Sequence, residues 1–235
     1  KQLLVENLPV VLAAAGQSEV IVVDDASKDG TLEWLKENYS QIKAIRNEKN
    51  LSFGESCNRG VKKAEGKIVL LLNNDVRPEK NFLDPIMGDF KDGEVFAVGC
   101  REKNIKNGRV LYEGRGVSAF KRGLMVHWRP ENQESKQAIW LSGGSMAVRK
   151  ELWLKLGGFD NLFRPAYEED RDICWQALKA GYKLVFEPKS IVNHIHETTN
   201  RSVFGEKKIQ FYSMKNQLLF VWKNISSLSL ILRHI

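Results

Sequence analysis

The sequence predicts an α/β domain in which helices flank a mostly parallel sheet, and two observations support this class. Two short runs of aliphatic and β-branched residues, at 19–23 and 67–72, lack the alternation of a half-exposed strand and are typical of strands buried on both faces. Segments with helical spacing of apolar residues separate these runs from each other and from a third strand, predicted at 42–46. The alternation of strand and helix favours a sheet with crossover helices.

The first helices are predicted from spacing and from turn chemistry. A helix is expected over 3–15, with Pro9 early in a turn or at the start of a new helix, because proline lacks the backbone N–H. The turn that follows the first strand ends in Asp29 or Thr31, either of which is a suitable cap for a helix at 32–38.

Later elements are predicted less completely. A helix is expected at 53–64 and strands at 96–100 and 183–187. Residues 101–122 are polar and rich in turn residues, so no helix or strand is predicted there. Residues 137–141 lead into a turn of small residues.

Composition bounds the class of protein. A chain of 235 residues with 43% hydrophobic content can form one domain with a sizeable core, with or without an appendage. The three cysteines are far apart and show no CxxC spacing, so neither a zinc site nor a disulfide framework is indicated. A reducing cytoplasm is the expected compartment.

The basic charge of the chain is concentrated after residue 200. Residues 201–235 carry six Lys or Arg and one acid, Glu206, and so supply five of the net +7 charges. Three interpretations stay open: a helix docked on the domain with its lysines facing water, a contact with an anionic membrane, or a nucleic-acid surface. No nucleic-acid-binding signature accompanies the charge, so no nucleic-acid partner is expected.

Polar residues follow the two buried strands at the place where ligands bind in such sheets. Asp24 and Asp25 come directly after the first run, and Asn73, Asn74 and Asp75 come directly after the second. Ligands of open α/β sheets bind outside the carboxyl ends of the strands. These positions therefore predict a nucleotide or metal site.

A second acidic cluster lies at the start of a predicted helix. Glu168, Glu169, Asp170 and Asp172 place four carboxylates within five residues. Acids stabilise a helix N-terminus, which explains one or two of them but not four. Two acidic clusters on different elements favour an active site that binds a cation and a polar substrate.

Three segments occur in a recognisable order: IVVDDASKDGT at 21–31, LLLNNDVRP at 70–78 and YEEDRDICWQALKAGYKLVFEP at 167–188. Together they resemble family 2 inverting glycosyltransferases of the GT-A fold, especially bacterial rhamnosyltransferases. The resemblance covers the chain from about residue 3 to residue 196. It implies a Rossmann-like GT-A domain over 1–200, with a nucleotide-binding half at about 1–99 and an acceptor-binding half at about 100–200. A basic amphipathic helical segment at 201–235 would follow.

The resemblance implies that six polar residues bind the nucleotide and its phosphates: Asp24, Asp25, Asn58, Arg59, Asn73 and Asn74. It places Asp75 as the principal ligand of Mg²⁺ or Mn²⁺, which would neutralise a departing diphosphate. His194 would lie near this metal, with His196 as the alternative.

The resemblance also implies the catalytic residues. Asp170 matches the family's catalytic base, which takes the proton of the attacking hydroxyl, and Glu169 and Asp172 would orient the acceptor or Asp170 itself. A loop at 140–145 would line the sugar: Gly143 and Gly144 permit close backbone approach. Trp140 either stacks on a sugar face or is a buried core residue.

The implied function is transfer of a sugar from a UDP- or dTDP-linked donor to a hydroxyl of a saccharide or lipid-linked acceptor in cell-surface polysaccharide synthesis. The expected location is cytoplasmic, with peripheral contact at the inner face of the membrane. The alternative is a catalytically inactive module that binds nucleotide sugars, which Asn73 and Asn74 favour because the family's motif there is richer in acids. The family's first strand has no counterpart here, so a chain without it is expected to be unstable or inactive.

Overall fold

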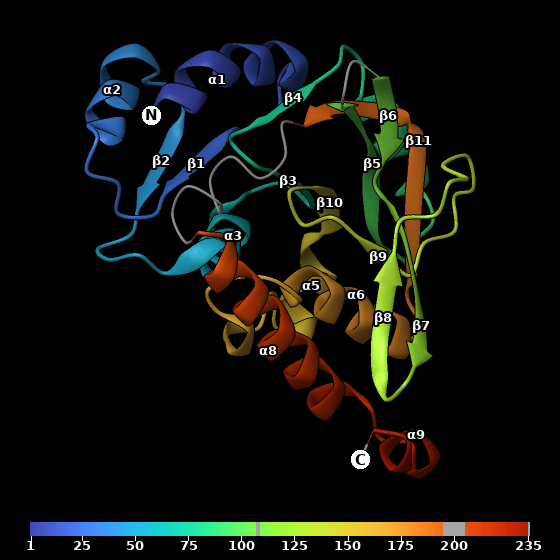
Figure 1. Ribbon diagram of the computed structural model, residues 1–235. Coiled ribbons are helices and arrows are strands. Elements are labelled where there is room, and N and C mark those ends of the chain that lie inside the picture. The colour runs from blue at the N-terminus through green and yellow to red at the C-terminus, as the bar shows by residue number, and fades with distance from the viewer. Residues whose placement is uncertain (107–108, 195–204, 235) are drawn as a thin grey trace.

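The computed structural model describes residues 1–106, 109–194 and 205–234 (Figure 1). The elements of its first half are α1 (Gln2–Ala15), β1 (Ile21–Asp24), α2 (Thr31–Asn38), β2 (Lys43–Arg46), α3 (Ser52–Lys63), β3 (Ile68–Leu72), β4 (Val76–Pro78) and α4 (Leu83–Asp89). The second half contains β5 (Val95–Lys106), β6 (Arg109–Glu113), β7 (Arg115–Lys121), β8 (Leu124–Trp128), β9 (Trp140–Leu141), β10 (Ser145–Arg149), α5 (Lys150–Leu156), the 3₁₀ turn η1 (Asn161–Phe163), α6 (Glu169–Lys179), β11 (Lys183–His194), α8 (Glu206–Asn224) and α9 (Leu228–Leu232). The α/β class is confirmed.

Strands β1 and β2 form a parallel pair at one end of the molecule, beside α1 and α2 (Figure 1). Leu8, Leu35 and Ile42 form a small buried cluster there. Helix α1 continues through Pro9, so the prediction that this proline lies early in a turn or begins a new helix is wrong. The missing N–H costs one hydrogen bond, and burial of Asn7 and Leu8 on the preceding turn holds the helix together.

The larger sheet has the strand order β3-β10-β5-β11-β4, and β6 also pairs with β5. Strand β10 is antiparallel to both β3 and β5, whereas β5 and β11 are parallel. The sheet is therefore mixed, because β10 enters between two strands that point the same way. Sequence patterning missed β10, whose five residues directly follow the predicted glycine turn.

Both faces of this sheet are covered. Phe96, Trp153, Phe159, Ile173 and Phe186 belong to a core cluster on the side of α5 and α6, and all five are almost completely buried. A second cluster fills the other face beneath α4. Packing on both faces fixes the carboxyl ends of the strands, where the predicted site lies.

The polar segment after β5 forms a small sheet of its own. Strands β7 and β8 make an antiparallel hairpin, and β9 pairs with the other edge of β7. The turn at Arg122 and Gly123 has positive φ at both residues, 50° and 79°, a conformation that matches the twist of a hairpin. This hairpin contacts α8, so the segment that sequence analysis left unassigned supports the C-terminal helix.

Helix α8 is a docked helix that has apolar residues on more than one side. Asn216, Phe220 and Val221 are buried, and the Asn216 amide donates to the carbonyl oxygens of Phe163, Ala166 and Tyr167 at 2.6–2.9 Å. Helix α8 is therefore docked on the domain, but its lysines do not all face water, because Lys223 pairs with Asp160 and Asp172. Within the described residues, no helix has the length and apolar character needed to cross a bilayer.

Candidate active site

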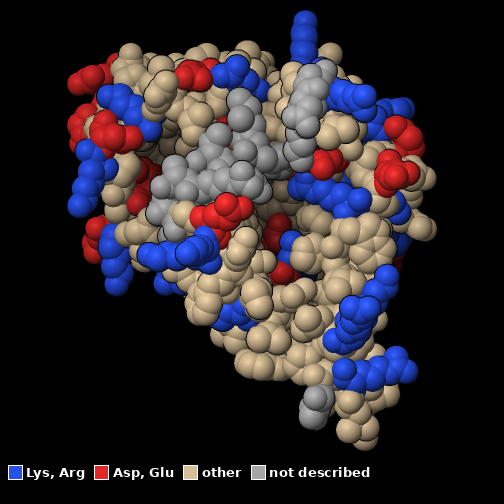
Figure 2. All heavy atoms as spheres, viewed as in Figure 1, with Lys and Arg blue, Asp and Glu red and all other residues tan. Residues whose placement is uncertain are grey.

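Three predicted segments meet at one end of the larger sheet. The Asn73 N–H donates to the Gly144 carbonyl oxygen at 3.0 Å, and the Gly143 N–H donates to Oδ2 of Asp170 at 3.2 Å. The turn between β9 and β10 thus joins the end of β3 to the start of α6. Figure 2 shows acidic side chains in a hollow near the middle of the face that it draws.

Asp170 is a half-buried carboxylate with fixed orientation. Its Oδ1 accepts from the Arg171 N–H at 2.8 Å, while Oδ2 accepts from Gly143. A Cβ at Gly143 would lie 3.2 Å from the Asp170 Cβ, so a side chain there would push Asp170 away by a few tenths of an ångström. Each carboxylate oxygen retains a further lone pair, which is what a general base requires.

The two acids that precede Asp170 are buried and have perturbed pKa values. Burial raises the pKa of Glu168 to about 7, against the opposing effect of Arg171, whose guanidinium donates to this carboxylate. Burial and the adjacent Asp170 charge raise the pKa of Glu169 to about 8. Tyr167 and Glu168 also have positive φ, 91° and 78°, so the entry to α6 is strained where the acids cluster.

Glu169→Gln is expected to stabilise the protein at alkaline pH. Because the folded-state pKa of Glu169, about 8, lies above the ordinary value of 4.5, the folded chain binds this proton more tightly than the unfolded chain. The free energy of unfolding of the wild type therefore falls as the pH rises from about 4.5 to about 8. Thermal melts should show the variant more stable than the wild type at pH 8.5, by on the order of a few kcal/mol, and equal to it near pH 4.5. An equal difference at both pH values would contradict this linkage.

The metal residues predicted from the resemblance also meet. The Nε2 atom of His194, at the end of β11, lies 3.4 Å from Oδ1 of Asp75, and its Nδ1 lies 3.4 Å from Oε1 of Glu102. Burial disfavours the imidazolium, but the two carboxylates outweigh burial and raise the pKa of His194 to about 9. His196 lies outside the described residues.

This donor set fits a divalent ion. A carboxylate oxygen and an imidazole nitrogen are ligands that Mn²⁺ accepts, and two adjacent ligands of an octahedral ion with bonds of about 2.1 Å lie roughly 3 Å apart. Asp75 and His194 are both largely buried, with the two donor atoms facing each other. Among the described residues no group of three or more His, Cys, Asp or Glu side chains is placed to hold a metal, so the remaining ligands would come from elsewhere, such as a diphosphate.

Asp24 and Asp25 organise the loop between β2 and α3. Asp25 accepts hydrogen bonds from the Asn47 amide at 2.8 Å and from the N–H groups of Leu51 and Ser52 at 2.7 and 2.9 Å. Asp24 pairs with Arg46 across the β1–β2 pair at 3.1 Å. Arg59 donates to Asn47 in turn, at 3.0 Å, so this predicted residue contacts the same loop.

Two predicted residues have structural partners within the protein. The Asn58 amide donates to the Phe159 carbonyl oxygen at 2.8 Å and accepts from the Phe159 N–H at 2.9 Å, which uses the side chain to join α3 to the segment after α5. Asp172 is buried and accepts from Lys223 at 2.7 Å and Asn224 at 2.8 Å, both on α8. From these contacts we infer packing roles for both residues, in place of the nucleotide-binding role predicted for Asn58 and the catalytic role predicted for Asp172.

Trp140 is a core residue rather than a sugar platform. The residue is 6% exposed, and the guanidinium carbons of Arg171 and Arg129 lie 5.2 and 5.9 Å from its ring centre. A Cβ at Gly116 would lie 2.2 Å from the indole ring, so the opposite strand is also in close contact. Of the two interpretations left open by the sequence, the buried one is correct.

Residues that the sequence did not single out complete the site region. Glu102 contacts His194, and Arg46 and Asn47 hold Asp24 and Asp25 at the end of β1. Glu102 lies at the start of the polar segment where no periodicity was legible. A buried glutamate in a strand carries no sequence signal that distinguishes it from an exposed one.

Comparison with known proteins agrees with this arrangement. Residues 4–156 match the family described as "Glycosyl transferase family 2". The pre-mycofactocin glycosyltransferase of Mycobacterium tuberculosis is 26% identical over 196 residues, which are 80% of this chain and 40% of that protein. The N-acetylglucosaminyl-diphospho-decaprenol L-rhamnosyltransferase of the same organism is 24% identical over 221 residues, 81% of this chain and 71% of that protein.

A solved structure shares the fold. The crystal structure of GalNAc-T7 with UDP, GalNAc and Mn²⁺ superposes with a TM-score of 0.73 at 20% identity, over 93% of this chain and 45% of that one. This chain thus spans less than half the length of the first of these relatives and of this structure. Since the family match covers more than half of its residues, the chain belongs to glycosyl transferase family 2, and it has the GT-A fold.

Proposed function

We propose that the protein is an inverting glycosyltransferase that moves a sugar from a nucleoside-diphosphate donor to a hydroxyl group of its acceptor. The observation that carries this proposal is the carboxylate of Asp170, held by the Gly143 amide at the mouth of α6. Asp75 and His194 lie at the same end of the sheet and supply the ligands for Mg²⁺ or Mn²⁺. This arrangement supports a base and a leaving-group site at one end of the sheet.

The chemistry is a single displacement. The acceptor oxygen attacks the anomeric carbon, its proton passes to Asp170, and the bond from that carbon to the diphosphate oxygen breaks with its electron pair left on the diphosphate. A divalent ion, when bound, neutralises charge on the departing diphosphate. The turn at Gly143 and Gly144 keeps the base in place, and the raised pKa of Glu169 reduces the negative charge beside it.

The substrates are proposed from the relatives. The relative named N-acetylglucosaminyl-diphospho-decaprenol L-rhamnosyltransferase supports a saccharide or lipid-linked acceptor. The donor that we propose is linked to UDP or dTDP, and the pathway is cell-surface polysaccharide synthesis. The structure with UDP and Mn²⁺ bound supports a nucleotide with a divalent ion. The alternative is an inactive module that binds nucleotide sugars, for which Asn73 and Asn74 in the metal motif are the supporting feature.

Release of the nucleoside diphosphate tests this function. The protein is incubated with UDP-glucose, UDP-GlcNAc, UDP-GalNAc or dTDP-rhamnose, with and without Mn²⁺, and free UDP or dTDP is measured by a coupled assay. We expect slow release of UDP or dTDP from one of the donors, and only when Mn²⁺ is present. A saccharide or polyprenyl-diphosphate acceptor should accelerate this release. Binding of a donor without release would favour the inactive module, and neither binding nor release would contradict both.

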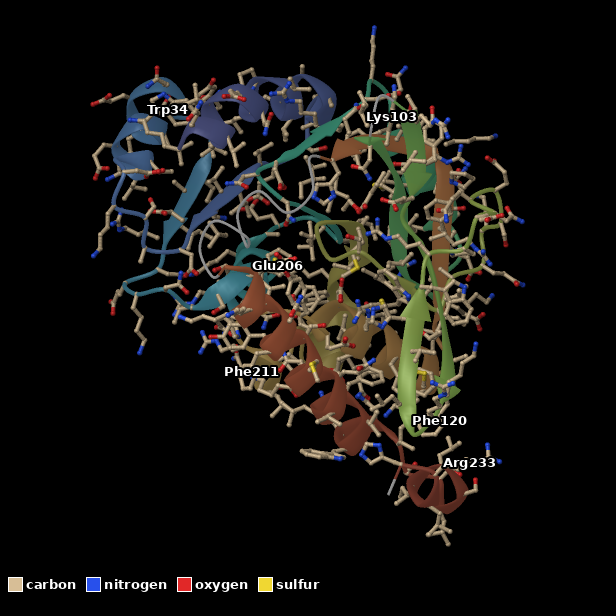
Figure 3. The ribbon with its side chains drawn as sticks, in the orientation of Figure 1. Trp34, Lys103, Phe120, Glu206, Phe211 and Arg233 are labelled. Carbon is tan, nitrogen blue, oxygen red and sulfur yellow. The ribbon has the colours of Figure 1, made fainter. Side chains whose placement is uncertain are left out.

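We also propose a peripheral membrane contact through α8, α9 and the β7–β8 hairpin, on the cytoplasmic side. Phe211, Met214 and Trp222 follow helical spacing along α8 and are 63%, 69% and 64% exposed. Residues 207–235 and 115–129 contain nine Lys or Arg and no acid, and the C-terminal end packs on the hairpin turn. Figure 3 shows Phe211 on α8, with Phe120 and Arg233 at the lower end of the molecule. Apolar side chains among cations suit an anionic lipid surface.

Vesicle binding should depend on these side chains. The protein is expected to co-sediment with vesicles that contain phosphatidylglycerol at low salt, and less with pure phosphatidylcholine. A double change, Phe211→Ser with Met214→Ser, should reduce binding several-fold, whereas Met87→Ser, 50% exposed on α4, should not. Equal binding by both variants, or no binding by the wild type, would contradict the proposal.

A further inference from the structure

Strand β5 carries a carboxylate in the interior of the molecule, beside the proposed metal site. Glu102 is fully buried, although a charged side chain in such a place loses its hydration and needs compensating partners. Neither sequence motifs nor the displacement chemistry assign it a role. Its position beside Nδ1 of His194 indicates a role for it.

The partners of Glu102 fix its carboxylate from three directions. Oε1 accepts from the Ser145 hydroxyl at 2.7 Å and lies 3.4 Å from Nδ1 of His194, while Oε2 lies 3.2 Å from a guanidinium nitrogen of Arg129. These partners come from β10, β11 and the segment after β8. Because they belong to three separate elements, the carboxylate position is determined by the tertiary fold.

His194 lies between two carboxylates. Nε2 faces Asp75 and Nδ1 faces Glu102, each at 3.4 Å, so the ring has a different acid at each nitrogen. If His194 keeps its proton on Nδ1, facing Glu102, and gives up the proton on Nε2 when an ion binds, the lone pair of Nε2 points toward Asp75. In metalloproteins, a ligating histidine almost always donates its other ring N–H to a carboxylate, a carbonyl or water, which fixes the ring and raises its basicity.

We propose that Glu102 is a positioning residue that orients the imidazole of His194 through Nδ1, so that Nε2 and Asp75 present a preformed pair of donors to the divalent ion. This inference rests on the metal site of the proposed function. A purely structural role, as the counter-charge of Arg129, is the competing explanation. Arg129 already pairs with Glu113 at 3.0 Å, so it has a second carboxylate without Glu102.

Glu102→Gln is the test, with Glu187→Gln as the matched control. Glutamine keeps the size of the side chain and an oxygen for Ser145 but loses the charge that holds His194. Glu187 is likewise buried, lies on β11 as His194 does, and pairs with a cation, Lys136. Both variants remove the charge of a buried glutamate that pairs with a cation in the same sheet, so both should lower the Tm.

Two quantities are measured by electron paramagnetic resonance. The loss of the free-Mn²⁺ signal reports Mn²⁺ binding, and the nitrogen modulation of the bound-Mn²⁺ signal reports coordination by an imidazole. We expect Glu102→Gln to weaken Mn²⁺ binding by about 10- to 100-fold and to reduce the imidazole signal. Glu187→Gln should leave both unchanged. Ser145→Ala removes one hydrogen-bond partner of the Glu102 carboxylate but keeps its charge, so it should weaken Mn²⁺ binding by less. This variant replaces Glu102→Gln in the test if Glu102→Gln does not fold.

The outcomes separate this inference from the metal site itself. If the wild type binds Mn²⁺ with an imidazole signal and Glu102→Gln does the same, the positioning role is overturned while the metal site stands. Equal weakening by Glu102→Gln and Glu187→Gln would assign both residues to stability alone and would also overturn it. If the wild type itself binds no Mn²⁺, the metal site of the proposed function fails, and the positioning role fails with it.

Discussion

Asp170→Asn is expected to lower kcat by roughly 10²- to 10⁴-fold while donor binding stays close to that of the wild type. Asparagine keeps the shape of the side chain and an oxygen for the Gly143 N–H, but its amide cannot take the proton of the acceptor hydroxyl. Steady-state assays with the donor that gives turnover would measure kcat, and calorimetric titration of its nucleoside diphosphate would measure binding. A variant that retains kcat would remove Asp170 from the mechanism.

Asp172→Asn is the control for this result, because it makes the same change two residues along the same helix. Its carboxylate is buried against Lys223 and Asn224 of α8, so its loss should destabilise the fold. Removal of one member of a buried ion pair typically costs about 3–5 kcal/mol. A lower Tm with kcat preserved below the melting transition is expected. If kcat instead fell as far as with Asp170→Asn, the reassignment of Asp172 to packing would be wrong.

Asp75→Asn is expected to abolish the contribution of Mn²⁺ to nucleotide binding. The carboxylate is the charged ligand of the proposed ion, and His194, which must give up a proton to bind the ion, supplies only one donor among the described residues. Calorimetric titration of UDP or dTDP with Mn²⁺ should give an affinity equal to that of the wild type without metal. Asp84→Asn, a change at an exposed acid on α4, should behave as the wild type.

Retention of the metal effect in Asp75→Asn would contradict the placement of the ion. The ion would then have to be held by other groups, and Glu102 and His194 would keep only the structural part of their roles. The Tm of the variant in the absence of ligand distinguishes this result from misfolding.

The sequence was most informative where local pattern and fold coincide. The runs at 19–23 and 67–72 are β1 and β3, because strands without a solvent-facing side must be apolar at every position. Strand β10 was missed because Ser145 and Met146 directly follow a glycine turn, and five residues show no period of their own. The β7–β8 hairpin was missed because its burial comes from α8, nearly a hundred residues away.

The sequence predicts a residue's place in the candidate site better when its side chain has one usual chemical role than when it has several. Asp170, Gly143 and the pair of Asp75 with His194 were named from sequence, and the fold brings them to one end of the sheet. Asn58 serves backbone hydrogen bonding as readily as ligand binding, and Trp140 packs as readily as it stacks. Those choices depend on tertiary partners, which local sequence does not contain.

The central claim is that this end of the sheet binds a nucleoside diphosphate together with a divalent ion. Thermal shift of the protein with UDP, dTDP and GDP, each with and without Mn²⁺, tests it most directly. A rise in Tm that requires both Mn²⁺ and either UDP or dTDP is the predicted result, and it would also name the base of the donor. No rise with any of the three nucleotides, with or without the metal, would contradict the account and leave the two carboxylate clusters as features of the fold alone.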